Sequence, residues 1–361
     1  MKLNKKWLVF LIVLFAFSFS GCQGSSSGAD TSSDSTGDAS SKDPQKLVVT
    51  SFGGAIQEAQ EEYIKQFEEE YNADVEVVTL YSADALAKMR AEKNNPSLDV
   101  VLFSGGQEQI AKDEGLLMEL DKSIIKNMDN LYEGAVHPDG HSVTFGYESL
   151  GLIYDENRVA APPTSWKDLW KEEYSGNVGL VDISNTYGYY FLLAASLMEG
   201  GSEDNIQPGL DIITKLIPNT AAIVSASPEV GNLFAQEEVM IAPFDSGYAY
   251  TFAEQGVPVN FATPDEGGIG IYMTANVVQG SKNPELAQQY IDFLLRPEIQ
   301  ALTAEGGGYS PTNVHTELPE KLSDILPNGE ESFNNLIHLD LEKVNNNRSA
   351  YTEQWNKLIS N

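Results

Sequence analysis

Basic residues are scarce in this sequence. It contains 22 Lys and Arg against 53 Asp and Glu, which gives a formal net charge of −31 at pH 7. A protein that binds nucleic acid needs a basic surface to displace counterions from the phosphates, and this chain has no basic excess. We therefore expect no nucleic-acid partner.

Cysteine is nearly absent, and histidine is rare. The single Cys excludes an internal disulfide framework and any metal cluster with several Cys ligands. Two of the four His, His137 and His141, flank Pro138-Asp139-Gly140. Pro and Gly predict a turn there, rather than a helix that presents both rings to a metal. We therefore expect neither a metal nor another cofactor.

The common sequence signatures of catalysis are also missing. The chain has no Walker loop and no G-x-G-x-x-G loop, and Gly267-Gly268-Ile269-Gly270 precedes a predicted strand, not a helix. The nearest approach to the G-x-S-x-G motif of serine hydrolases, at 146–151, has the wrong spacing. These absences favour a protein that is not an enzyme, with a secreted α/β hydrolase or transferase as the alternative.

No apolar run is long enough to span a membrane. The longest, at 7–17, falls short of the roughly 20 residues that a transmembrane helix needs. It follows three lysines near the start of the chain, and this combination is typical of a secretory signal peptide. We therefore interpret residues 1–21 as a signal peptide.

The residues that follow the apolar run suggest a lipid anchor. Phe19-Ser20-Gly21-Cys22 resembles a bacterial lipobox, which implies lipidation of Cys22 and attachment at the outer face of the bacterial cytoplasmic membrane. An ordinary signal peptide followed by a chance Cys is the alternative. Residues 22–45 are rich in Ser, Thr, Gly and Asp and lack aromatic residues, so they predict a flexible tether.

From residue 46 onward, predicted strands and helices alternate. Strands are expected at 46–51, 75–80, 99–103, 178–181, 239–242 and 269–278. Helices are expected at 56–71, 82–92 with Ser82 as N-cap, 107–114, 166–172, 187–198, 210–216, 228–236, 284–295 and from 297. The alternation predicts an α/β fold with a parallel sheet flanked by helices, and 361 residues are enough for two lobes.

Two loops place Ser and Gly where such folds bind ligands. Ser51-Phe52-Gly53-Gly54 and Ser104-Gly105-Gly106 each follow a strand and open a helix, so both lie at the carboxyl edge of the predicted sheet. Gly lets the backbone approach a ligand closely, and free helix N–H groups attract electron-rich atoms. A third loop of this kind is 182–186. The alternative is that all three contain only good turn and cap residues.

Aromatic residues and acids gather in the second half of the chain. Phe244-Asp245-Ser246-Gly247-Tyr248 follows a predicted strand, Tyr187 and Tyr190 begin a predicted helix, and Tyr272 and Thr274 lie on the strand after Gly268. Aromatic faces beside carboxylates suit an ammonium group. Tyr190 continues into an apolar run and is expected in the core, whereas Tyr187 and Asp245 are favoured as functional residues.

The order of short motifs along the chain resembles a known family. The matching stretches are Ser51-Phe52-Gly53-Gly54, Asp99-Val100-Val101 with Ser104, Gly151-Leu152-Ile153-Tyr154-Asp155, Ser165-Trp166-Lys167-Asp168-Leu169-Trp170, Gly267-Gly268-Ile269, Asn276-Val277-Val278, Tyr290-Ile291-Asp292-Phe293-Leu294-Leu295 and Gly308-Tyr309-Ser310-Pro311-Thr312-Asn313. They are similar to the solute-binding proteins of ABC importers, in the branch that contains the spermidine/putrescine receptors. The similarity covers roughly residues 46–330.

The resemblance implies a two-lobed periplasmic-binding-protein fold of type II, in which each lobe is a mixed sheet flanked by helices. Lobe 1 would comprise 46–146 and 269–315, and lobe 2 would comprise 147–268 and 316–361. The chain would cross between the lobes near 144–150 and 265–272. The ligand would bind in the cleft between them and pass to ABC transporter permease subunits, with the receptor acting as a monomer.

The resemblance supports an inference about the fold more fully than one about the ligand. The polyamine receptors have two acids where this chain has Ile183 and Thr186. They have a further Trp and acid where this chain has Ile271 and Met273. The set of acids and aromatics that holds a long polyamine is therefore largely missing.

Other positions of the family site are kept. Phe244 retains an aromatic side chain, and Ser104 matches a Ser that contacts the ligand. With Asp245, these residues suit a small polar solute that carries an amine, either polyamine-like or zwitterionic, such as an aminophosphonate. The candidate ligand-binding residues are Ser51, Phe52, Gly53, Gly54, Ser104, Gly105, Tyr147, Asp182, Thr186, Tyr187, Phe244, Asp245, Tyr248, Tyr272 and Thr274. A surface sensor with the same fold is the alternative to a transport receptor.

Overall fold

The computed structural model describes residues 43–360. The predicted signal peptide, Cys22 and most of the predicted tether lie outside these residues. Within the described range, no helix combines the length and the apolar character that crossing a membrane requires. Residues 43–360 belong to one compact unit.

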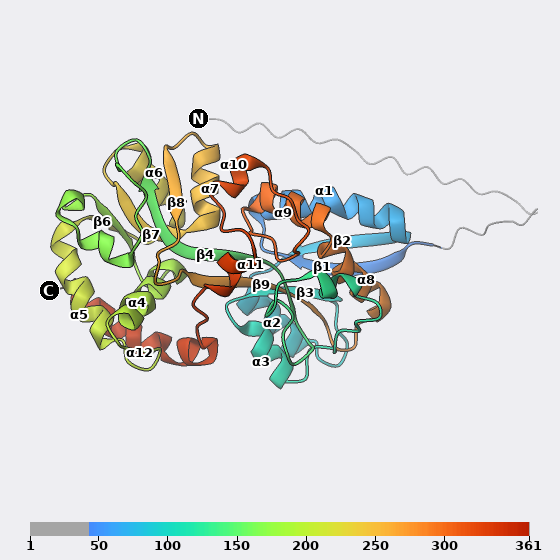
Figure 1. The fold of residues 1–361 in the computed structure, drawn as a ribbon. Coiled ribbons are helices and arrows are strands. Elements are labelled where there is room, and N and C mark those ends of the chain that lie inside the picture. The colour runs from blue at the N-terminus through green and yellow to red at the C-terminus, as the bar shows by residue number, and fades with distance from the viewer. Residues whose placement is uncertain (1–42, 361) are drawn as a thin grey trace, which may run out of the picture. The chain divides into compact units, whose positions relative to one another are not determined.

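The strands form a single mixed sheet of nine strands within residues 43–360 (Figure 1). Its order is β2-β1-β3-β9-β4-β7-β5-β6, and β8 pairs with β4. The strands are β1 (Gln45–Ser51), β2 (Ala73–Thr79), β3 (Val100–Ser104), β4 (Val143–Asp155), β5 (Val178–Val181), β6 (Thr220–Val224), β7 (Ile241–Asp245), β8 (Val259–Ala262) and β9 (Ile269–Val277). The predicted α/β class is confirmed, although the mixed sheets expected of the two lobes are joined into one.

The helices cover both halves of this sheet. They are α1 (Gly54–Tyr71), α2 (Ser82–Ala91), α3 (Gln107–Asp113), α4 (Thr186–Met198), α5 (Gln207–Leu216), α6 (Ser227–Ala235), α7 (Ser246–Glu254), α8 (Pro284–Leu294), α9 (Pro297–Gly307), α10 (Glu320–Ser323), α11 (Glu330–Asn334) and α12 (Leu341–Ile359). The 3-10 helices are η1 (Lys126–Asn130), η2 (Trp166–Trp170), η3 (Glu172–Tyr174) and η4 (Ile217–Asn219).

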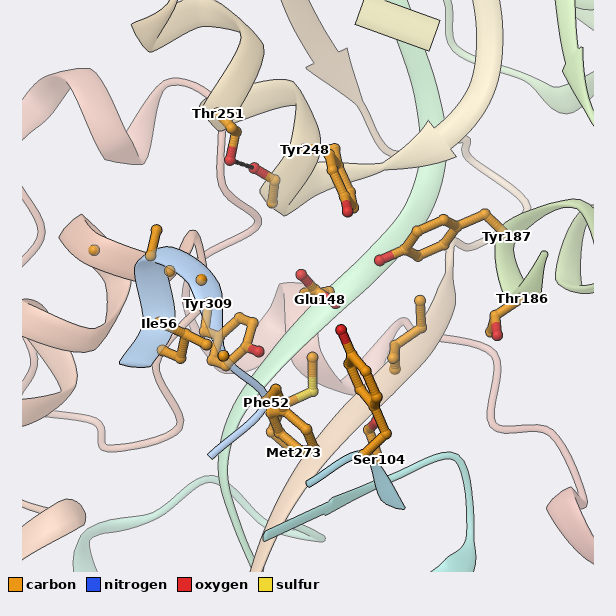
Figure 2. A pocket seen from close by; sticks show the side chains of 18 of the residues that line it. Phe52, Ile56, Ser104, Glu148, Thr186, Tyr187, Tyr248, Thr251, Met273 and Tyr309 are labelled. Carbon is orange, nitrogen blue, oxygen red and sulfur yellow. Dashed lines mark hydrogen bonds between the residues drawn. The ribbon is translucent and has the colours of Figure 1, made fainter. Parts of the chain in front are cut away.

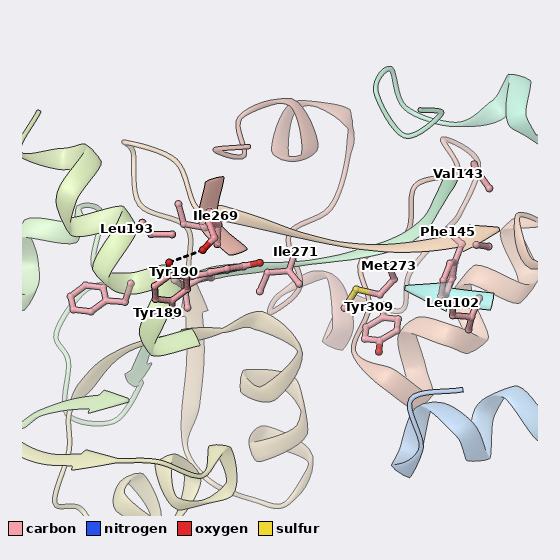
Figure 3. Packing of buried hydrophobic residues seen from close by; sticks show 14 of the residues in the cluster. Leu102, Val143, Phe145, Tyr189, Tyr190, Leu193, Ile269, Ile271, Met273 and Tyr309 are labelled. Carbon is pink, nitrogen blue, oxygen red and sulfur yellow. Dashed lines mark hydrogen bonds between the residues drawn. The ribbon is translucent and has the colours of Figure 1, made fainter. Parts of the chain in front are cut away.

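The long strands β4 and β9 hold the two halves of the sheet together. β4 pairs with β9 from Val143 to Leu150 and with β7 and β8 from Leu150 to Asp155, while β9 also pairs with β3. Every residue of β4 is buried. Figure 3 shows core side chains along this pair of strands, from Val143 to Ile269. These strands lie where the two chain crossings are expected, and the division into lobes remains a prediction.

Most predicted elements are present, with a few corrections. The segment at 166–172 forms 3-10 rather than α-helix, and the strand predicted at 239–242 begins and ends later, as β7. Ser82 is the first residue of α2 and not its N-cap, because its Oγ instead accepts a hydrogen bond from the backbone N–H of Ser104 over 2.9 Å. Three strands, β4, β6 and β8, and the helices after residue 315 were not predicted.

The C-terminal segment packs back onto both β9 and α4. The N–H of Ile337 donates to the carbonyl of Gly268 over 2.8 Å, and the N–H of Gly270 donates to the carbonyl of Ile337 over 3.1 Å. Further on, Trp355 of α12 is buried and donates from Nε1 to Asp182 Oδ2 over 2.8 Å. This segment therefore fixes the positions of β9 and of the loop before α4.

Candidate functional site

A cavity of about 700 Å³ opens where the two halves of the sheet meet (Figure 2). The starts of α1, α2, α4 and α7, the ends of β3 and α9, and the middle of β4 and β9 contribute to its wall. The lining residues are Phe52, Gly53, Gly54, Ala55, Ile56, Tyr81, Ser104, Glu148, Ser184, Asn185, Thr186, Tyr187, Gly247, Tyr248, Thr251, Ile271, Met273, Gly306, Gly307 and Tyr309. This volume suits a small organic molecule.

Glycines bring the start of α1 to the cavity. Gly53 and Gly54 have φ angles of +84° and +61°, a backbone conformation that a side chain disfavours. The N–H of Gly53 donates to Ser51 Oγ over 3.4 Å, which holds the turn between β1 and the helix. As a result, Phe52 and the first residues of α1 line the cavity, whereas Ser51 is buried outside its wall.

A close approach between α4 and β5 places the opposite wall. A Cβ added to Gly188 would lie 2.2 Å from the carbonyl oxygen of Val181, so only glycine lets the helix sit this near the strand. Asn185 caps the helix, with its Oδ1 accepting from the N–H of Tyr187 over 3.0 Å. Thr186 and Tyr187 consequently line the cavity.

The central feature of the cavity is a pair of buried acids, Glu148 and Asp245. Leu150 of β4 lies opposite Asp245 of β7 in an antiparallel register. Side chains two residues apart on a strand share a face, so Glu148 lies on the same face as Asp245 and one step closer to α7. Glu148 is 7% exposed and lines the cavity, whereas Asp245 is 0% exposed and lies behind it.

Gly247 shows how tightly the two carboxyl groups are held. A Cβ built on this residue would lie 2.6 Å from Glu148 Oε1 and 3.2 Å from Asp245 Oδ1. Both acids therefore crowd the first turn of α7, close enough for the charge of one to act on the other. Asp245 also caps α7, with Oδ1 accepting from the N–H of Tyr248 over 3.0 Å.

Burial sets the protonation of this pair. Desolvation, and then the neighbouring Asp245, raises the pKa of Glu148 well above its usual range. Burial also raises the pKa of Asp245, but N–H donors at the start of α7 favour its charged form and oppose the rise. We infer that Asp245 is the member that ionises first and that Glu148 keeps the proton.

Tyrosines surround Glu148 in the cavity, and Figure 2 shows Tyr187, Tyr248 and Tyr309 around its carboxyl group. The rings of Tyr187 and Tyr248 meet edge to face with centroids 5.8 Å apart. Burial raises the pKa of all three phenols, so they stay neutral at physiological pH. Among residues 43–360, no Lys, Arg or His lines the cavity.

Part of the predicted site lines this cavity: Phe52, Gly53, Gly54, Ser104, Thr186, Tyr187 and Tyr248. Their contact with a ligand remains a prediction. The other candidates do not line it: Ser51, Gly105, Tyr147, Asp182, Phe244, Asp245, Tyr272 and Thr274.

Several of these other candidates are engaged in packing. Tyr147 donates from its hydroxyl to the carbonyl of Pro327 over 3.0 Å, and Asp182 accepts from Trp355. The ring of Tyr272 stacks on His338 with centroids 5.1 Å apart. Thr274 is buried in the sheet, where its Oγ1 accepts from Asn276 Nδ2 over 3.2 Å.

The remaining candidates support the cavity from behind. Phe244 is buried and packs edge to face on Tyr187, with ring centroids 4.9 Å apart. Gly105, at φ +86°, accepts from the side chain of Asn345 over 3.3 Å and so contacts the C-terminal helix. Asp245 acts on the cavity through Glu148.

Sequence reasoning missed Glu148, which is the one carboxylate that the described residues place in the wall of the cavity. The sequence feature that could have identified it is an acid within a largely apolar stretch, because buried acids are rare unless they are paired or functional. Tyr81 and Ile56 were missed as well, because the loop and helix positions that bring them to the cavity depend on tertiary packing.

The sequence matches the family of bacterial extracellular solute-binding proteins over residues 62–324. The spermidine/putrescine-binding periplasmic protein of Escherichia coli K12 is 28% identical over 313 residues, which cover 82% of this chain and 87% of that protein. The gamma-aminobutyric acid-binding protein of Pseudomonas aeruginosa is 26% identical over 313 residues, which cover 82% of this chain and 86% of that protein.

Solved structures agree with this assignment. The spermidine/putrescine ABC transporter substrate-binding protein of Streptococcus pneumoniae has a TM-score of 0.75 at 26% identity and covers 87% of this chain and 99% of its own. An extracellular solute-binding protein of Bordetella parapertussis has a TM-score of 0.78 at 22% identity, which supports the fold alone. The predicted type II binding-protein fold is thus confirmed, and the chain belongs to the bacterial extracellular solute-binding proteins that serve ABC importers.

Proposed function

We propose that this protein captures a small solute with an ammonium group and delivers it to the permease of an ABC importer. The observation that carries this proposal is the buried acid pair Glu148 and Asp245, for which the described part of the chain places no basic residue in the cavity wall. A buried carboxylate without a counter-charge is costly, and a ligand ammonium supplies that charge. The surrounding tyrosines add cation–π attraction.

The relatives support an amine as the ligand. They are named for spermidine and putrescine in one case and for gamma-aminobutyric acid in another. All three compounds carry an ammonium group at neutral pH. Because the relatives are binding proteins rather than enzymes, we infer that this chain also binds its solute without altering it.

The shape of the cavity accommodates a second polar group on the ligand. The starts of α1 and α4 open on the wall formed by Gly53, Gly54 and Thr186, and helix starts favour negative charge. A zwitterion with its ammonium at Glu148 and its anion toward these helices is one form of the ligand. A short polyamine is the other.

We further propose that the ligand acts by closing two lobes, 46–146 with 269–315 and 147–268 with 316–361. Phe52 and Ser104 line the cavity from the first of these segments, and Tyr187 and Tyr248 line it from the second. A ligand that contacts both sides binds the closed form more tightly and shifts the population toward it. The permease then recognises the closed form.

Thermal-shift measurements with a matched panel test the ligand class. We expect spermidine, putrescine or 4-aminobutanoate to raise the Tm of the purified protein, because a bound ligand stabilises by RT ln(1 + [L]/Kd). Butane-1,4-diol and butanoate, which lack the ammonium, should leave Tm unchanged. Stabilisation by amine-free compounds, with none by the amines, would contradict the proposal.

We also propose that a lipid on Cys22 anchors the protein outside the bacterial cytoplasmic membrane. The support is the resemblance of Phe19-Ser20-Gly21-Cys22 to a lipobox. We expect cells fed labelled palmitate to incorporate the label into the wild-type chain and not into Cys22→Ala. Equal labelling of the two chains would refute the anchor, and the binding function would stand.

A further inference from the structure

We propose that an ammonium ligand displaces a proton shared by Glu148 and Asp245, so that solute capture releases one proton, with Asp245 as the positioning residue. This inference rests on the proposed function, since it needs a cationic ligand at Glu148. It goes further, because it makes the affinity of the receptor depend on pH and gives a role to a residue that does not line the cavity.

The geometry of the pair provides the shared proton. Both carboxyl groups crowd the same point, since a Cβ built on Gly247 would lie 2.6 Å from Glu148 Oε1 and 3.2 Å from Asp245 Oδ1. Two ionised carboxylates repel at such a distance, so one proton between them is the stable arrangement. Asp245 Oδ2 receives no hydrogen bond from an N–H or hydroxyl group of the described residues. The protonated carboxyl group of Glu148 is therefore the neighbouring donor that remains for Asp245 Oδ2.

Within residues 43–360, the elements packed around the pair place no cationic group beside it that could replace the proton. Tyr187 of α4, Tyr248 of α7 and Tyr309 after α9 face the two acids and are neutral phenols. The described residues pair neither acid with a Lys, Arg or His in a salt bridge. The positive charge that permits both acids to ionise must therefore come from the ligand.

The location of the proton determines which acid meets the ligand. Asp245 caps α7 and is held in its charged form by N–H donors, so the proton resides on Glu148, the member that faces the cavity. When the ammonium nitrogen takes the position of this proton, Glu148 ionises and the proton passes to the solvent. Charge is conserved, because one cation enters as one proton leaves.

Two consequences are measurable. Below the pH at which the empty pair loses its proton, the affinity for the amine should rise about tenfold for each pH unit, as linkage requires for one displaced proton. A neutral analogue of the same shape cannot replace the proton and should bind weakly at every pH. The protonated pair therefore selects for cations.

Calorimetric titration with putrescine or 4-aminobutanoate, whichever stabilises the protein, tests this inference. The heat of binding in buffers of different ionisation enthalpy gives the number of protons released. We expect release approaching one proton per ligand below the pH at which the empty pair loses its proton, with less release as the pH rises through that point. Asp245→Asn keeps an N-capping oxygen for α7 and the burial of Glu148, which is the main cause of its raised pKa, but removes the neighbouring charge that raises this pKa further.

For Asp245→Asn we expect proton release to fall and the pH dependence of affinity to move to lower pH. A purely structural role of Asp245 would change Tm and leave the proton count as in the wild type, so an unchanged count overturns the inference. Amine binding without proton release by the wild type also overturns it and leaves the proposed function intact. Failure of every amine to bind refutes both.

Discussion

Glu148→Gln is expected to weaken binding of the stabilising amine by about 30-fold or more at about pH 8. Loss of one member of a buried, hydrogen-bonded charge pair costs about 2–5 kcal/mol of binding free energy. The substituted amide would keep the shape of the side chain and a hydrogen-bond donor for Asp245, so the cavity should remain intact. The measurement is the dissociation constant by calorimetry.

The matched control for this variant is Glu173→Gln. Glu173 is an exposed acid of η3, outside the cavity wall, so its replacement makes the same change in net charge. If long-range attraction by the acidic surface governed binding, the two variants would weaken it equally, more so at low salt. Comparable affinities of Glu148→Gln and the wild type would exclude Glu148 as the ammonium acceptor.

Glu148 also illustrates what the sequence alone could and could not provide. Local signals predicted most of the α/β order, since strands such as β5 and helix starts such as Asn185 follow from apolar runs and capping chemistry. The residues that open helices at strand ends, including Gly53, Ser104 and Thr186, were therefore found as cavity residues.

What escaped prediction depends on contacts between distant parts of the chain. Asp245 was correctly expected at the end of a strand, but whether it faces the cavity depends on Glu148 lying in front of it, a pairing set by the register of β4 and β7. Asp182 likewise lies between β5 and α4, as expected. Its carboxylate accepts a hydrogen bond from Trp355 of α12 and does not line the cavity. The residues that neighbour Asp245 and Asp182 in the sequence do not indicate either contact.

The buried acid pair should also lower the stability of the empty receptor relative to a variant without the charge of Glu148. With no ligand, Glu148→Gln should be more stable than the wild type at a pH above the raised pKa of Glu148. Each unit by which a buried pKa exceeds its ordinary value costs about 1.4 kcal/mol once the pH lies above it. In a unit of this size, 1 kcal/mol corresponds to a change of roughly 1.5 °C in Tm.

The sign of the pH dependence distinguishes this effect from better packing. Folding raises the pKa of Glu148, so below the unfolded pKa both states hold the proton and the acid costs nothing. As the pH rises through the folded pKa, the unfolded chain ionises first and the wild type loses stability. The gap in Tm between Glu148→Gln and the wild type should thus be small near pH 4 and grow toward pH 8.

The ligand should reverse this order of stability. A saturating amine stabilises the wild type by RT ln(1 + [L]/Kd) and leaves Glu148→Gln little changed, because the variant lacks the charge that binds the ammonium. Glu173→Gln should follow the wild type at every pH, with and without amine, since exposed substitutions change stability by about 0.5 kcal/mol or less. A gap in Tm that is constant with pH would show that packing, and not the charge of Glu148, sets the difference. A residue that destabilises the empty protein and is compensated only by its ligand is selected for binding rather than for folding.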